Sequence, residues 1–129
     1  MKIKALIAIV TLFISTFATL TAQSPIESNS MEVSTMLKKD KKLVVLDVRT
    51  AGEFQAGHVK GAVNIDVTQQ GALEKINKLD RKARYIVYCR TSRRSKIATD
   101  HMVQNGFKTV YQMMDGFSGW TANNLEVVK

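Results

Sequence analysis

Short apolar runs of strand length alternate along this chain with stretches of helical periodicity. The runs KKLVVLDV (41–48), RYIVYC (84–89) and KTVYQM (108–113) are rich in β-branched and aromatic residues, which is typical of buried strands. Between them, GALEKINKL (71–79) and SKIATDHMVQNG (95–106) repeat apolar residues at helical spacing. Strands that alternate with helices predict an α/β fold, in which helices cover both faces of a mostly parallel sheet.

Weaker patterns add four further elements. MEVSTMLKKD (31–40) suits a short helix, and TAGEFQAG (50–57) fits about one helical turn that ends at a glycine. GAVNI (61–65) fits a further short strand, which follows the strand at 41–48 along the chain. DGFSGWTANN (115–124) is a loop or short helix that contributes Trp120 to the core.

The first 22 residues have the order of a secretory signal peptide, with two lysines, then an apolar run, then small residues ending near Ala22. Residues 23–30 are polar and contain the only proline, so we expect a flexible lead there and a folded domain over 31–129. Cleavage predicts a periplasmic or secreted bacterial protein that has no membrane contact afterwards. The alternative is an uncleaved membrane anchor.

The chain carries 19 Lys and Arg against 11 Asp and Glu, which gives a net charge of +8. These basic residues are scattered, and no nucleic-acid-binding motif accompanies them, so we expect no nucleic-acid partner. The charge indicates solubility and an attraction for small anions.

Cys89 is the only cysteine, and it stands where the run RYIVYC ends and a helix is expected to begin. In parallel sheets the functional site lies at the carboxyl ends of the strands. Arg90, Arg93 and Arg94 follow within five positions. Nearby cations and a helix N-terminus favour a thiolate, so we expect the loop to hold an anionic sulfur and an anionic substrate. The alternative is an inert buried cysteine beside a solvated basic helix.

Four segments resemble the rhodanese family. LDVRTAGEFQAGHVKGAVNID (46–66) resembles its signature, and VYCRTSRRS (87–95) resembles its active-site loop, often written Cys-Arg-Ser-Gly-x-Arg-Ser. NGFKTVYQM (105–113) and DGFSGW (115–120) resemble the closing strand and the ending of the domain. The resemblance implies a single-domain rhodanese with a five-stranded, mostly parallel sheet and helices on both faces.

The resemblance also implies sulfurtransferase chemistry at Cys89. The thiolate would take the outer sulfur from a small anionic donor such as thiosulfate and carry it as a persulfide. A thiol or cyanide acceptor would then remove the sulfur. This covalent, two-step reaction needs no cofactor and no metal.

The active-site loop supplies the candidate residues for binding the donor. Arg94 matches the arginine of the family loop, and guanidinium groups suit oxyanions. Ser92 stands where the family pattern usually has glycine, so a positive φ there would carry a conformational cost. The substrate-binding candidates are Arg90, Thr91, Ser92, Arg93, Arg94 and Ser95.

Four residues of the signature are expected to support the site. Asp47, at a strand end, could accept hydrogen bonds from loop amides. Arg49 and Glu53 could pair across one helical turn, with Arg49 at the rim of the pocket. His58 is expected to order its turn.

Two other functions stay open. Phosphatases of the same fold carry His-Cys followed by five residues and arginine, because their loop must encircle a phosphate. Here Tyr88 precedes Cys89, and Arg94 is the fifth residue after Cys89, one position earlier than in the phosphatase pattern. The shorter loop therefore favours a sulfurtransferase over a phosphatase or an arsenate reductase. The other alternative is a non-catalytic module that binds a partner or senses redox state through its thiol.

Overall fold

The computed structural model describes Ser15 and residues 23–129. The elements between Ile26 and Val128 form a parallel sheet with helices on both faces. The five strands are all parallel. Their order across the sheet is β1 (Ile26–Ser28), β6 (Thr109–Met113), β5 (Arg84–Tyr88), β2 (Val44–Asp47) and β4 (Val63–Asn64). The predicted five-stranded α/β fold is therefore confirmed.

The alternation of side chains along the strands builds two cores. In β5, Tyr85 and Val87 point to one face of the sheet, whereas Ile86 and Tyr88 point to the other. All four side chains are buried, because a central parallel strand is covered on both sides. This explains why RYIVYC reads as a continuous apolar run.

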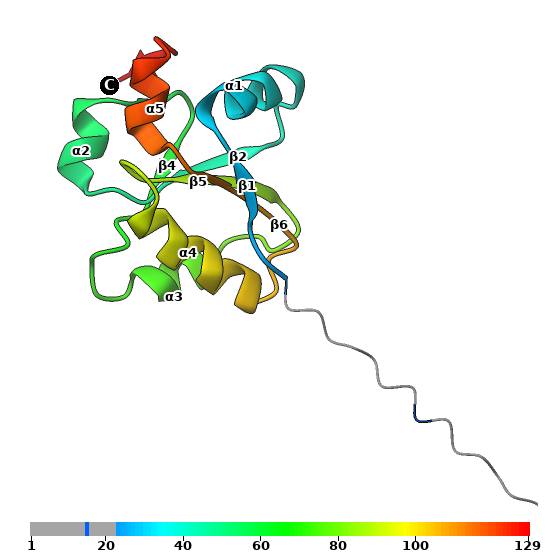
Figure 1. The fold of residues 1–129 in the computed structure, drawn as a ribbon. Coiled ribbons are helices and arrows are strands. Elements are labelled where there is room, and N and C mark those ends of the chain that lie inside the picture. Colours follow the sequence, from blue (N-terminus) through cyan, green and yellow to red (C-terminus); the bar gives the residue numbers. More distant parts are fainter. Residues whose placement is uncertain (1–14, 16–22) are drawn as a thin grey trace, which may run out of the picture.

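Helices form the two covering layers (Figure 1). On one face, α4 (Arg93–Gln104) packs against β5 and β6, and α3 (Ala72–Asn77) packs against α4. On the other face, α1 (Ser30–Lys39) packs against α5 (Gly116–Ala122).

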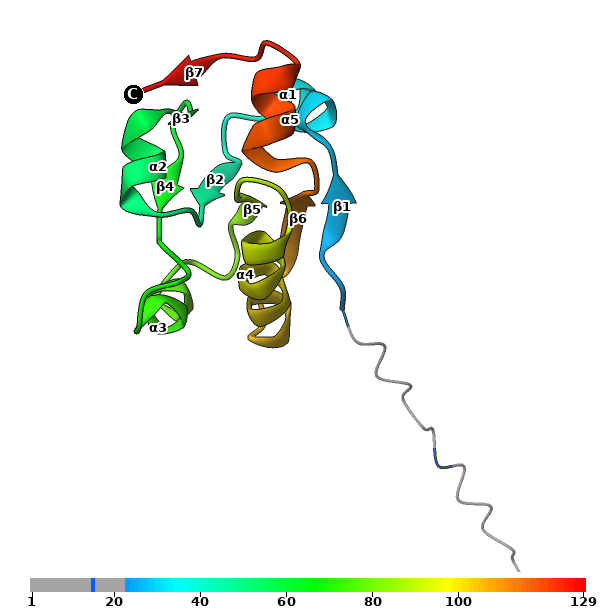
Figure 2. The ribbon, with the colours of Figure 1, turned by 60° about the vertical axis from the view of Figure 1, so that its left-hand side comes forward.

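Two short elements complete the domain beside α5 and α2 (Ala51–Ala56). Strands β3 (His58–Val59) and β7 (Val127–Val128) pair antiparallel in a second, two-stranded sheet. Figure 2 shows this pair at the end of the molecule opposite α3. The C-terminal residues are thereby joined to the turn that follows α2.

Local capping explains where two of the helices begin. The Asn29 side chain accepts a hydrogen bond from the Glu32 amide at the start of α1. At the start of α2, Thr50 and Glu53 form a capping box, in which each side chain bonds the other residue's amide. Glu53 is therefore fixed in orientation by the helix that carries it.

The prediction of a flexible lead over 23–30 is wrong for the part that forms β1. Residues 26–28 pair with β6, and Met114 donates its amide proton to the Ser28 carbonyl at 2.8 Å. The Ser30 amide and hydroxyl then bond Asp115. A three-residue edge strand has too few residues to show a period, so the sequence pattern did not reveal it.

The expected signal peptide, residues 1–22, lies outside the described residues apart from Ser15. None of the helices in the described part of the chain has the length and apolar character needed to cross a membrane.

Candidate functional site

Cys89 directly follows the last residue of β5, at the carboxyl end of the sheet. The alternation of β5 turns its side chain into the core beneath α4, where it is only 1% exposed. Its Sγ atom lies 3.5 Å from the hydroxyl of Ser95, which is also buried. The sulfur is therefore held in a defined position under the loop that leads into α4.

Helix α5 fixes the first half of this loop through two backbone hydrogen bonds. The Phe117 amide donates to the Cys89 carbonyl at 2.8 Å, and the Ser118 amide donates to the Arg90 carbonyl at 3.0 Å. Gly116 permits the contact, because it has φ of +58° and an added Cβ would lie 2.5 Å from the Arg90 carbonyl oxygen. The loop carbonyls are thereby drawn toward α5.

Gln112 of β6 fixes the second half of the loop. Its Nε2 group donates to the Ser92 carbonyl and to the Ser95 hydroxyl, both at 2.9 Å. Ser95 in turn donates to the Ser92 carbonyl at 3.1 Å. Ser92 has φ of −140°, so this serine needs no left-handed backbone and carries none of the expected cost.

The backbone amides of the loop are left available for a ligand. Among the hydrogen bonds of the described residues, none is donated by a backbone amide between Arg90 and Ser95. The amides of Arg93, Arg94 and Ser95 lie in the first turn of the twelve-residue helix α4, where the helix dipole favours negative charge. A loop with tethered carbonyls and free amides can stabilise an anion at the Cys89 sulfur.

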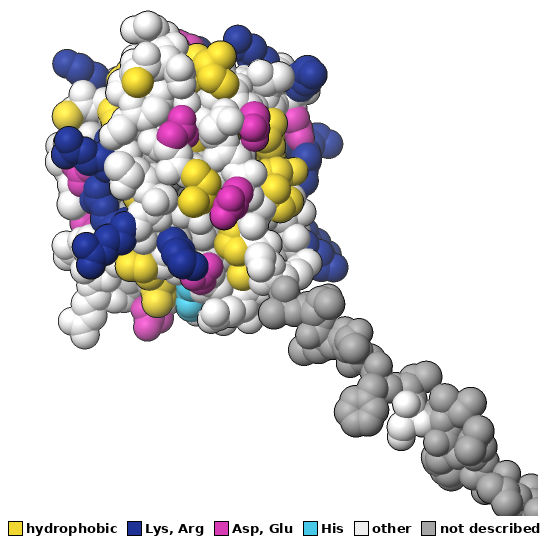
Figure 3. All heavy atoms as spheres, viewed as in Figure 1, with side chains coloured by type: hydrophobic (Ala, Val, Ile, Leu, Met, Phe, Trp, Pro, Cys, Tyr) yellow, Lys and Arg dark blue, Asp and Glu magenta, His cyan; other side chains and the backbone are white. Residues whose placement is uncertain are grey.

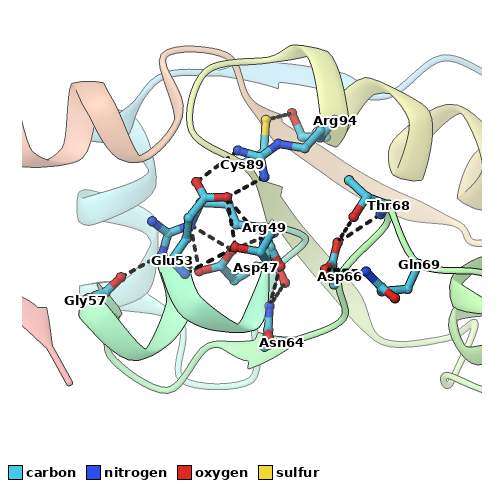
Figure 4. Close-up of polar contacts among 12 residues, drawn as sticks. Asp47, Arg49, Glu53, Gly57, Asn64, Asp66, Thr68, Gln69, Cys89 and Arg94 are labelled. Carbon is cyan, nitrogen blue, oxygen red and sulfur yellow. Dashed lines mark hydrogen bonds and ion pairs between the residues drawn. The ribbon is translucent and has the colours of Figure 1, made fainter.

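Arg94 makes a bidentate ion pair with Glu53 of α2 beside Cys89 (Figure 4). The two nitrogen–oxygen distances are 2.6 and 3.0 Å. Arg94 thereby lowers the pKa of Glu53 to about 2, and the same hydrogen bonds raise the pKa of Arg94. The Arg94 guanidinium, which the sequence predicted would bind the sulfur donor, is instead paired with the Glu53 carboxylate.

The other loop residues are more open to solvent. Arg90, Thr91 and Arg93 are exposed, and Ser92 is partly buried. Figure 3 shows Lys and Arg side chains along the edge of the molecule where α2 and the beginning of α4 lie. This basic edge attracts small anions toward the loop.

Asp47 and Arg49 form a buried ion pair at the end of β2. Arg49 donates to both Asp47 oxygens and, at 2.6 Å, to the Gly57 carbonyl. Tyr88 donates its hydroxyl proton to Asp47 at 2.6 Å, and burial together with this carboxylate raises the pKa of Tyr88. The expected Arg49–Glu53 pair is therefore wrong. Asp47 also accepts a hydrogen bond from the backbone amide of Arg49 at 3.0 Å, so the expectation that this strand-end carboxylate bonds a loop amide is confirmed.

His58 and Asn64 order the segments next to this pair. The His58 ring stacks on Phe54 with centroids 3.7 Å apart and bonds the Phe54 carbonyl. The Asn64 side chain donates to the carbonyls of Asp47 and Arg49, both at 2.9 Å. The Asn64 contacts hold the turn that carries Arg49, and the His58 contacts hold the end of α2, the helix that carries Glu53.

Sequence reasoning missed Gln112, Asn64 and Gly116 as supports of the site. Gln112 is a buried amide in an otherwise apolar run, and Gly116 precedes an aromatic residue at a helix start. The buried polar residue inside a strand was the available signal, because such a group must find partners.

A hollow of about 320 Å³ lies beside the loop. Arg49, Glu53, Arg90 and Phe117 are among its lining residues, with the Arg49 guanidinium 4.0 Å from the Phe117 ring centroid. Among the described residues, no group of His, Cys, Asp and Glu is arranged to hold a metal ion. Cys89 is not among the lining residues; Arg90 contributes an exposed guanidinium to the hollow, whereas the Arg49 guanidinium is buried and paired with Asp47.

Comparison with known proteins places this geometry in a family. Residues 31–123 match the model of the rhodanese-like domain. The chain is 30% identical over 88 residues to a protein of Coxiella burnetii named thiosulfate sulfurtransferase GlpE, covering 68% of this chain and 80% of that protein. It is 35% identical over 83 residues to a Bacillus subtilis protein named putative sulfur carrier protein YrkF, covering 64% and 43%.

Solved structures agree with the fold. A rhodanese-related protein of Thermoplasma volcanium superposes with a TM-score of 0.70 and 25% identity, covering 82% of this chain and 98% of that chain. The Wolinella succinogenes polysulfide-sulfur transferase has the same fold, with a TM-score of 0.66 and 24% identity over 81% and 78% of the two chains. The chain belongs to the rhodanese-like domain family.

Proposed function

We propose that the protein is a sulfurtransferase that carries sulfur as a persulfide on Cys89, with thiosulfate as a donor. The observation that carries the proposal is the loop around Cys89, whose carbonyls are tied to α5 and Gln112 while its amides remain free. The family and the names of two relatives support sulfur transfer.

In the first step, the Cys89 thiolate attacks the outer sulfur of thiosulfate. A new S–S bond forms, the S–S bond of the donor breaks, and sulfite leaves with the electron pair. The thiol proton has gone to solvent beforehand. The negative outer sulfur of the persulfide then accepts hydrogen bonds from the free loop amides. The Ser95 hydroxyl, which bonds the Ser92 carbonyl in the resting state, can rotate to donate to sulfur.

In the second step, a thiolate or cyanide attacks the outer sulfur of the persulfide. Cys89 leaves as a thiolate, and the product is an organic persulfide or thiocyanate. The loop amides stabilise negative charge on sulfur before and after transfer, so one binding site serves both steps. The exposed arginines and the basic edge raise the local concentration of the anionic donor.

Turnover of thiosulfate with cyanide tests this proposal. We expect thiocyanate formation by the wild-type protein and none by Cys89→Ser, since serine cannot form the persulfide. Aryl phosphate hydrolysis, measured in parallel, should be negligible, because the loop is one residue shorter than the phosphatase signature requires. A phosphatase rate that exceeds sulfur transfer would overturn the proposal.

A sulfur-carrier or partner-binding module is the second candidate, because Cys89 is buried and one relative is named a putative sulfur carrier. Such a protein would take up one sulfur but release it only to a specific partner. Formation of a Cys89 sulfur adduct without thiocyanate turnover would favour this candidate.

A further inference from the structure

A second and larger cleft, of about 600 Å³, lies on the face of the sheet opposite Cys89. It is bounded by the end of α1, by the turn at residues 60–61 and by the segment 124–126. None of the loop residues between Cys89 and Ser95 is among its lining residues. The cleft is therefore separate from the proposed sulfur-transfer site.

The floor of this cleft is apolar. Val45, Val59 and Trp120 are buried in the core and line it, and Leu37 and Leu125 form its partly buried sides. The cleft is a surface feature of about 600 Å³ whose floor is formed by these core side chains. Its size is within the range of sites for small organic ligands.

The wall at residues 124–126 is held in place by hydrogen bonds. Asn124 has φ of +53°, which turns the chain after α5. The Leu125 amide then donates to the Trp120 carbonyl, and the Trp120 indole N–H donates to the Glu126 carbonyl at 2.8 Å. Because the indole N–H is satisfied within the wall, Trp120 offers the cleft an apolar surface.

The rim of the cleft is cationic. Lys38, Lys41 and Lys60 are exposed, and Lys41 Nζ bonds the Leu37 carbonyl, which holds its ammonium over the end of α1. Two carboxylates also line the cleft. Asp40 is paired with Arg84, so Glu126 is the one that opposes the three lysines.

We propose that this cleft binds an organic anion with an apolar body, such as a medium-chain carboxylate. The acyl chain lies on the floor formed by Val45, Val59 and Trp120, and the carboxylate faces the lysine ammonium groups. The proposal rests on the charge and shape of the cleft and not on the chemistry at Cys89.

Trp120 is the only tryptophan of the chain, so its fluorescence reports on this cleft without labelling. The purified protein is titrated with decanoate and, separately, with decyltrimethylammonium, which has an apolar chain of matched length and the opposite charge. We expect a saturable change of Trp120 fluorescence with decanoate and a weaker one with decyltrimethylammonium. Equal affinity for both, or no saturable change with decanoate, would overturn the proposal.

Paired lysine variants locate the binding. Lys41→Gln with Lys60→Gln removes two rim charges and should weaken decanoate binding about tenfold. Lys42→Gln with Lys82→Gln removes the same charge from exposed positions outside the cleft and should leave affinity unchanged. Equal weakening by both pairs would indicate general charge attraction and contradict the proposal. The same titration with Cys89→Ser should match the wild type, so its outcome does not depend on sulfur transfer.

Discussion

The ion pair between Glu53 and Arg94 should make the stability of this protein depend on pH in a defined acid range. Replacing Glu53 by Gln keeps an oxygen for the capping contact with Thr50 but removes the charge that faces Arg94. The pKa of Glu53 falls from its ordinary value of 4.5 to about 2, chiefly because of the hydrogen bonds from Arg94. Since one pKa unit corresponds to about 1.4 kcal/mol, the shift sets an upper bound of roughly 3.5 kcal/mol.

Solvent screening reduces this value. The side chains of Glu53 and Arg94 are 31% and 23% exposed. We therefore expect Glu53→Gln to lower the free energy of unfolding at pH 7 by about 1–2 kcal/mol. Because the folded-state pKa lies below the unfolded value, the carboxylate stabilises the fold fully above pH 4.5. This stabilisation is lost as the pH falls toward 2, and the wild type and the variant should converge there.

Urea unfolding of wild type and Glu53→Gln at several pH values between 7 and 3 measures the difference. Arg94→Gln is the matched variant, because it removes the other half of the pair and should show the same pH dependence. A double variant that loses no more than either single one would identify the pair as the source. A difference that stays constant from pH 7 to pH 3, or that is absent at pH 7, would refute the reasoning.

Three further predictions concern the loop supports and the N-terminal segment. Gln112→Ala removes two hydrogen bonds to the loop and should cost about 1–3 kcal/mol of unfolding free energy in urea, with reduced sulfur transfer; unchanged stability and turnover would contradict this role. Gly116→Ala should lower turnover strongly because its Cβ would meet the loop backbone, whereas Gly52→Ala, with open space around its Cβ, should leave turnover unchanged. Equal rates in these two variants would show that the close approach of α5 is unimportant. N-terminal sequencing of protein recovered from the bacterial periplasm should give a chain that begins near Gln23; a chain beginning at Met1 in the membrane fraction would favour the anchor.

The main strands and the position of Cys89 could be predicted because their signals are local. Three apolar runs gave β2, β5 and β6, and the order of strand, cysteine and helix placed Cys89 at the carboxyl end of the sheet. The core side chains are buried on both faces, so the runs are continuous and easily recognised.

The partners within the site could not be predicted, because they depend on contacts between distant segments. Arg94 and Glu53 are 41 positions apart, and Gln112 is 20 positions from Ser92. Local spacing instead suggested an Arg49–Glu53 pair. In the structure, Glu53 caps α2 and pairs with Arg94 of α4, and Arg49 pairs with Asp47. Strand β1 was missed because three residues next to a polar segment carry no period.

The most direct test of sulfur transfer at Cys89 is the intact mass of the purified protein after treatment with thiosulfate. If the free amides of the loop stabilise a persulfide, the mass should increase by one sulfur atom, and addition of a reducing thiol should restore the original mass. Cys89→Ser should show no change under either condition. A wild-type protein that gains no sulfur, or a Cys89→Ser protein that gains as much as the wild type, would contradict the account.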